Sequence, residues 1–104
     1  MAGWVRIAAL EDLPDGYGVR VEVGQDVIAL FRVGDSVHAL GDRCTHAEAS
    51  LAEGEVFAGM VECPRHGSEF DLETGRPHSL PATSPVPVYP TKIQDGDVLL
   101  EVAT

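Results

Sequence analysis

The chain has few basic residues and no long apolar run. Lys and Arg together number 7 against 17 Asp and Glu, which gives a formal net charge of −10. A negative field of this size repels phosphate backbones and anionic headgroups. The longest apolar run, Val27–Phe31, has five residues, whereas a transmembrane helix needs about 20. We therefore expect no nucleic-acid partner and no membrane association.

The length of the chain bounds its architecture. Its 104 residues are enough for one domain with one modest hydrophobic core. The amino-terminal segment meets the acidic Glu11 and Asp12 before a long apolar stretch forms, which is unlike a secretory signal. We therefore expect a cytoplasmic protein, and we expect a monomer because no long apolar edge indicates an obligate dimer.

Alternating side chains and turn residues predict strands on both sides of the chain's middle. Val19, Val21 and Val23 alternate with charged residues, as in a half-buried strand. The apolar segments 27–33 and 37–40, separated by a Gly-Asp-Ser turn, extend this strand into an antiparallel meander. Near the end, segments 91–94 and 98–102 flank an Asp-Gly-Asp turn, so two more strands form a closing hairpin.

The middle of the chain, from residue 41 to about 80, has a different composition. It contains few β-branched runs and several glycines, so we expect loops with short strands. Single helical turns are possible at Glu11–Leu13 and within His46–Glu53. The prolines of the following segment predict an extended connector at a sheet edge, because Pro cannot donate a ladder hydrogen bond. This segment contains Pro81, Pro85, Pro87 and Pro90.

Both cysteines of the chain lie in this loop-rich middle, each beside a histidine. The two motifs are Cys44-Thr45-His46 and Cys63-Pro64-Arg65-His66. Two thiolates and two imidazoles from two loops suit a soft or borderline metal. A tetrahedral zinc ion accepts this ligand set, although Cys-x-His spacing is tight for one ion. A Rieske cluster accepts it better, because each motif can give its Cys to one iron and its His to the other. A Cys44–Cys63 disulfide would leave both histidines unexplained.

The motif pair and its surroundings resemble the Rieske-type ferredoxins. The resemblance also includes Leu13–Gly16, Phe70-Asp71, Thr74-Gly75 and the closing hairpin. It implies an all-β fold of antiparallel sheets, with a β-sandwich-like base and an inserted, loop-rich cluster-binding subdomain at about 41–80 of a single domain spanning 1–104. It also implies one Rieske-type [2Fe-2S] cluster per chain. The implied ligands of its irons are Cys44, His46, Cys63 and His66.

The resemblance implies a one-electron carrier that takes electrons from a flavoprotein reductase and passes them to a terminal oxygenase or similar acceptor. It is not expected to be an enzyme, since 104 residues leave no room for a catalytic domain, and only His38 and His78 remain for a mononuclear iron. Three alternatives stay open: a small Rieske subunit of another redox complex such as assimilatory nitrite reductase, a ferredoxin of iron–sulfur assembly, and a Cys₂His₂ zinc-stabilised interaction module.

The same resemblance predicts the redox potential. Ala49 and Arg65 stand where high-potential Rieske proteins have a pair of disulfide-bonded cysteines, and Phe70 stands where they have a hydrogen-bonding Tyr. Ser68 matches the position of the Ser whose hydroxyl donates to a cluster sulfur. With one donor of two and no disulfide, we expect a potential toward the negative end of the Rieske range of about −150 to +300 mV.

Negative charge is concentrated around the motifs. Residues 41–76 hold eight acidic residues and three Arg, half of the chain's net charge in about a third of its length. We therefore expect a transient, salt-sensitive encounter with basic surfaces on the partners. The acidic residues of this segment are Asp42, Glu48, Glu53, Glu55, Glu62, Glu69, Asp71 and Glu73.

Substitution of the motif residues tests the ligand set. Cys44→Ser or His66→Ala should abolish the red-brown colour and the reduced-state EPR signal and leave the middle loops disordered, because metal binding supplies folding free energy there. His38→Ala and His78→Ala should keep the colour. The assignment is wrong if either control bleaches the protein while His66→Ala does not, and a colourless wild-type protein containing zinc would support the interaction module.

Overall fold

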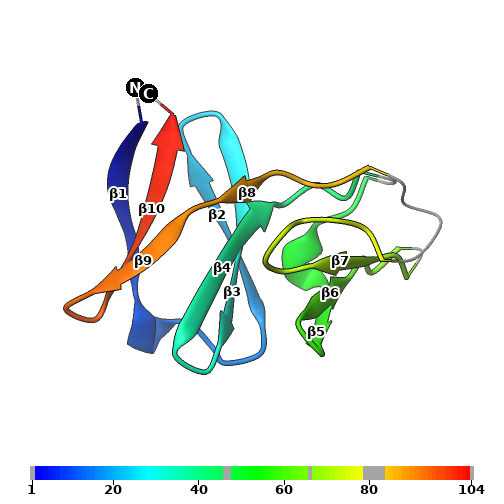
Figure 1. The fold of residues 1–104 in the computed structure, drawn as a ribbon, viewed down its shortest axis with the longest axis horizontal. Coiled ribbons are helices and arrows are strands. Elements are labelled where there is room, and N and C mark those ends of the chain that lie inside the picture. The colour runs from blue at the N-terminus through cyan, green and yellow to red at the C-terminus, as the bar shows by residue number, and fades with distance from the viewer. Residues whose placement is uncertain (1, 46–47, 66, 79–83, 104) are drawn as a thin grey trace.

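The computed structural model describes residues 2–45, 48–65, 67–78 and 84–103, and within them the chain forms three antiparallel sheets (Figure 1). The first sheet has the order β1 (Ala2–Ala9), β10 (Asp97–Ala103), β9 (Thr91–Gln94). The second has the order β2 (Gly18–Val23), β3 (Asp26–Val33), β4 (Ser36–Gly41), β8 (Val88–Tyr89). The third consists of β5 (Glu55–Phe57), β6 (Met60–Glu62) and β7 (Glu69–Asp71).

The described residues contain two helical elements, both single 3₁₀ turns. They are η1 (Leu10–Asp12) and η2 (Leu51–Glu53), within or overlapping the segments where the sequence indicates a helical turn. No helix in the described part of the chain is long and apolar enough to cross a membrane.

The first two sheets form the base of the molecule by packing face to face. Ile28 and Leu30 of β3 belong to the same buried cluster as Val98 and Leu100 of β10. The two sheets therefore enclose one core, which confirms the expected sandwich-like base. In Figure 1 the base lies to the left, and β1 and β10 bring the two termini side by side.

The third sheet packs on the other side of β3. Side chains alternate between the two faces of a strand, and β3 is buried on both: Ala29 and Phe31 belong to a second cluster with Val61 of β6 and Phe70 of β7. The apolar run at Val27–Phe31 is thus explained by a strand between two cores. In Figure 1 the third sheet lies to the right of the second sheet.

Most of the predicted strands are confirmed. The meander corresponds to β2, β3 and β4, and the closing hairpin corresponds to β9 and β10. Part of the proline-rich connector, residues 79–83, lies outside the described residues; the remainder contains β8, which pairs with β4 at the edge of its sheet, as expected.

The strand β1 was not predicted from the sequence. Its pairing with β10 joins residues at opposite ends of the chain and shifts register between Arg6 and Ala8. Trp4 and Val5 are both partly exposed, 41% and 37%, so apolar and polar positions do not alternate cleanly. The strand is stabilised by a distant partner rather than by a local pattern.

The turn η2 lies close against the base. Leu51 is fully buried, and a Cβ atom placed on Gly18 would lie 2.5 Å from the carbonyl oxygen of Ala52. Because the glycine at position 18 has no side chain, the backbone of η2 can lie directly against the backbone of β2. This contact joins the segment after the first Cys-x-His motif to the base.

Candidate metal centre

The two cysteines begin loops of the same construction. The backbone N–H of Cys44 donates to the carbonyl oxygen of Ala49 at 3.0 Å, and that of Cys63 donates to the carbonyl oxygen of Ser68 at 2.7 Å. Each bond joins a cysteine to the residue five positions later, so each motif lies within a short closed loop. In the second loop, the N–H of Gly67 also donates to the carbonyl oxygen of Cys63 at 3.0 Å.

The structure brings the two cysteines into one buried cluster. Cys44 is 1% exposed and Cys63 is fully buried, and both belong to the cluster that contains Leu51, Val61 and Phe70. Both lie among the described residues, and no disulfide joins them. The disulfide alternative therefore has no support in the structure.

The histidines of the two motifs, His46 and His66, lie outside the described residues, so their roles as ligands stay predictions. Within the described part of the chain, no group of three or more Cys, His, Asp or Glu side chains is placed to hold a metal ion. Ser68 lies in the second loop and is fully buried, as the proposed donor to a cluster sulfur must be. Whether its hydroxyl makes that bond stays a prediction.

The residues that are described fit an iron–sulfur cluster. Two cysteines from two separate loops, shielded by apolar side chains, provide the thiolate half of a Rieske ligand set. Gly67 has φ +76°, and the space where its Cβ would lie is open except for the Glu62 side chain at 3.8 Å. A left-handed conformation of this kind favours glycine, and here it lets the second loop turn back toward β7.

Asp71 organises the turn that follows the second loop. Its Oδ1 accepts hydrogen bonds from the backbone N–H groups of Glu73 at 2.8 Å and Thr74 at 3.0 Å, and its Oδ2 lies 3.3 Å from Nε2 of His78. The bond from Thr74 is the main cause that lowers the pKa of Asp71, and partial burial opposes the shift. The turn positions His78, whose backbone N–H donates to the carbonyl oxygen of Glu69.

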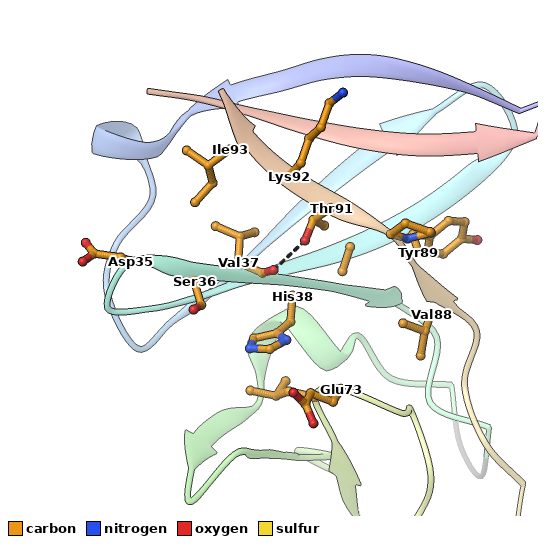
Figure 2. A pocket seen from close by; sticks show the side chains of 13 residues that line it. Asp35, Ser36, Val37, His38, Glu73, Val88, Tyr89, Thr91, Lys92 and Ile93 are labelled. Carbon is orange, nitrogen blue, oxygen red and sulfur yellow. Dashed lines mark hydrogen bonds between the residues drawn. The ribbon is translucent and has the colours of Figure 1, made fainter. Parts of the chain in front are cut away.

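The two remaining histidines lie outside both cysteine loops, as expected. His38 of β4 lines a hollow of about 440 Å³ between the base and the turn after β7. Figure 2 shows its ring pointing toward Glu73, while Thr91 donates a hydrogen bond to the carbonyl oxygen of Val37 at 2.7 Å. His78 contacts Asp71 instead.

Comparison with known proteins agrees with this geometry. A family model described as the Rieske [2Fe-2S] domain matches residues 3–90. The chain belongs to the Rieske [2Fe-2S] family. Its fold class is therefore confirmed as the antiparallel, all-β fold of Rieske ferredoxins.

Relatives of this Rieske protein share nearly its whole length. The ferredoxin subunit of anthranilate 1,2-dioxygenase from Burkholderia cepacia is 41% identical over 102 residues, which cover 98% of this chain and 94% of that protein. The ferredoxin of carbazole 1,9a-dioxygenase from Nocardioides aromaticivorans IC177 has a TM-score of 0.90 and 37% identity, covering 93% and 95% of the two chains.

A second similar structure contains an oxygenase together with a ferredoxin. It is a complex of reduced oxygenase and oxidised ferredoxin in carbazole 1,9a-dioxygenase, and one of its chains matches with a TM-score of 0.86 and 40% identity, covering 93% of this chain and 91% of that chain. Together the family and the relatives show that this Rieske protein carries one Rieske-type [2Fe-2S] cluster and is an electron carrier rather than a catalytic enzyme.

In the sequence, Asp42 is one of several acidic residues around the motifs. The structure places it among the buried polar residues, 4% exposed, two positions before Cys44. Its location directly after a strand and before the first motif is the one signal in the sequence that could have singled it out.

The lowered pKa of Asp71 predicts a pH-dependent contribution to stability. A carboxyl group whose pKa is lower in the folded state stabilises the fold above its unfolded pKa of about 3.9, and this contribution is lost as the pH falls through the lower, folded pKa. Asp71→Ala should therefore reduce the free energy of unfolding by roughly 1 kcal/mol near neutral pH, and the difference from wild type should shrink below about pH 3.9.

Urea unfolding from pH 7 to pH 2.5 measures this difference, with Asp12→Ala as the matched control. Asp12 is exposed in η1 and should give a small change at every pH. A deficit for Asp71→Ala that stays constant down to the lowest pH would show that its ionised form is not what the turn stabilises.

Proposed function

We propose that this Rieske protein transfers single electrons from a flavin-dependent reductase to the oxygenase component of a dioxygenase, as a monomer in the cytoplasm. The observation that carries the proposal is the burial of Cys44 and Cys63 in one cluster of a chain 41% identical over 98% of its length to a dioxygenase ferredoxin subunit. The structural match to a ferredoxin in complex with its oxygenase supports the choice of acceptor.

The segment of about 41–80 serves in this proposal as the cluster-binding subdomain. Cys44 and Cys63 hold the cluster from the buried side, and His46 and His66 complete the ligand set. When bound, the cluster accepts and releases one electron at a time. The loops hold the two thiolates in place through the N–H bonds of Cys44 and Cys63, and the apolar side chains around them exclude water.

The structure separates the acidic residues of this segment into two groups. The first group consists of Asp42, which is buried and hydrogen-bonded, Glu48, which pairs with Arg43, and Asp71, which binds its own turn. The bonds of Asp42 and Asp71 hold the backbone near them, whereas the exposed pair of Glu48 with Arg43 adds little to stability. The other acidic residues lie on η2, on the third sheet and in the turn after β7.

The outer face of the third sheet carries a row of glutamates, which we call the glutamate row: Glu55, Glu62 and Glu69. Glu55 pairs in register with Glu62, and Glu62 pairs with Glu69. Like charges directly opposite on neighbouring strands are destabilising. Lys or Arg side chains of a partner would relieve the repulsion between Glu55 and Glu62, and Glu62 directly precedes Cys63. We therefore assign the docking of the basic partner surface to this row.

Charge substitutions test the docking assignment. The double variant Glu55→Gln/Glu62→Gln should slow the second-order electron transfer to the oxygenase component by about tenfold at low ionic strength, because steering by complementary charge raises association rates by ~10-fold or more. The difference should vanish at high ionic strength. Stopped-flow reoxidation of the reduced protein measures both rates.

The matched control is Glu11→Gln/Asp12→Asn, which removes the same charge from η1 on the base. Equal effects of the two double variants would show that the glutamate row acts only through the net charge of the protein and is not the docking site. A wild-type rate independent of salt would contradict electrostatic steering. Electron transfer to a nitrite reductase but to no oxygenase would assign the protein to that alternative complex.

The potential tests the proposed role of Ser68. If its hydroxyl donates to a cluster sulfur, Ser68→Ala should lower the potential, since the bond stabilises the more negative reduced state; about 59 mV corresponds to ~1.4 kcal/mol for one electron. Phe70→Tyr should raise it by adding the missing donor. Voltammetry of the wild type should give a value in the negative part of the Rieske range. An unchanged potential in Ser68→Ala would show that the Ser68 hydroxyl does not donate to a cluster sulfur.

A further inference from the structure

The carboxylate of Asp42 lies at the base of the first cysteine loop. β4 ends at Gly41, and Asp42 follows with 4% of its surface exposed. Its backbone continues the connection to the base, because its N–H donates to the carbonyl oxygen of Val27 at 3.0 Å. A buried carboxylate is costly unless it is hydrogen-bonded, so its partners indicate what it does.

Asp42 binds the far side of the same loop through three hydrogen bonds. Its Oδ1 accepts from the hydroxyl of Ser50 at 2.8 Å and from the backbone N–H of Ala52 at 3.0 Å. Its carbonyl oxygen accepts from the N–H of Leu51 at 2.7 Å. The three donors are consecutive residues, so one aspartate holds the whole segment that follows the loop.

One of these bonds replaces a missing helix cap. Ser50 occupies the N-cap position of η2, but its side chain makes no capping hydrogen bond. An N-cap oxygen usually accepts from the second or third N–H of the helix, which in η2 includes the N–H of Ala52. Asp42 therefore supplies from the other side of the loop the acceptor that Ser50 does not supply.

The charge of Asp42 also has a partner on the base. Nε of Arg20 in β2 lies 3.6 Å from Oδ2 of Asp42. The Arg20 side chain is about half exposed, 53%, so this pair adds little to stability. The pair with Arg20 uses Oδ2, so Oδ1 is the oxygen that accepts the hydrogen bonds from Ser50 and Ala52.

The two cysteine loops differ in what supports them. The second loop connects β6 to β7, whose paired residues extend from Glu62 and Glu69 away from the loop. The first loop is flanked, in the described residues, by the isolated bridge between Arg43 and Ser50. Asp42 thus provides for the first loop the anchoring that a strand ladder provides for the second.

We propose that Asp42 is a positioning residue for the cluster: by capping η2, its carboxylate holds the loop of Cys44 in the conformation that binds iron. The inference rests on the proposed ligand role of Cys44. Asp42 acts through the backbone, since its bonds to residues 50–52 hold the segment directly after Ala49, whose carbonyl oxygen accepts the N–H of Cys44.

The experiment compares Asp42→Ala, Asp42→Asn and Ser50→Ala in the cluster-containing protein. Asp42→Ala should release the cluster at least about tenfold faster in the presence of an iron chelator, equivalent to ~1.4 kcal/mol, and should broaden the EPR signal of the reduced state. Asp42→Asn should restore both properties to near wild type, because an amide oxygen can accept the same two bonds. Ser50→Ala should fall between wild type and Asp42→Ala.

The matched control is Asp15→Ala, which also removes a carboxylate that accepts a backbone N–H, here that of Gly34 at 2.9 Å in the base. It should lower the melting temperature without changing cluster release or the EPR line width. Equal release rates in Asp42→Ala and Asp15→Ala, or a wild-type EPR signal and release rate in Asp42→Ala, would overturn the proposal.

If Asp42→Ala does not fold, Ser50→Ala decides the question: faster cluster release supports the proposal, and a wild-type release rate overturns it. Failure of the proposed ligand set gives a different result. In that case Cys44→Ser would keep the cluster, whatever the behaviour of the Asp42 variants.

Discussion

The burial of β3 on both of its faces is the constraint on which the rest of the structure depends. One face contributes Ile28 and Leu30 to the core of the base, and the other contributes Ala29 and Phe31 to the cluster that contains both cysteines. A register shift of one residue would exchange these faces, so the pairing of β3 with β2 and β4 fixes both cores at once. Both cysteines are therefore packed against the second sheet.

The third sheet uses its two faces for different tasks. Val61 and Phe70 face the buried cysteines, while the glutamate row occupies the outer face of the same strands. Alternation along a short strand therefore places apolar side chains beside the cysteines on one face and the proposed docking charge on the other face of the same sheet. This arrangement suits an electron carrier, whose redox centre must be shielded from water and still lie close to the surface that its partner contacts.

Local turn chemistry made much of the fold predictable. The Asp95-Gly96 hairpin turn was expected from the sequence, and both residues have positive φ values, 52° and 79°, as a tight hairpin turn requires. The alternating valines of β2 and the continuous apolar run of β3 were equally informative, because both are local patterns. β1 was missed because its stability comes from β10, at the far end of the chain, and no local pattern reports such a partner.

The proposed chemistry of the site can be read directly from the amino-acid sequence: two Cys/His motifs, their spacing and the acidic composition around them. Which carboxylates are buried and which lie on the outer face of a sheet depends on the tertiary structure. Asp42 and Glu62 are alike as residues, yet Asp42 is buried under η2 and Glu62 pairs with other glutamates on the third sheet. The physical reason is that burial and strand register depend on residues distant in the chain, whereas ligand identity depends on the side chain alone.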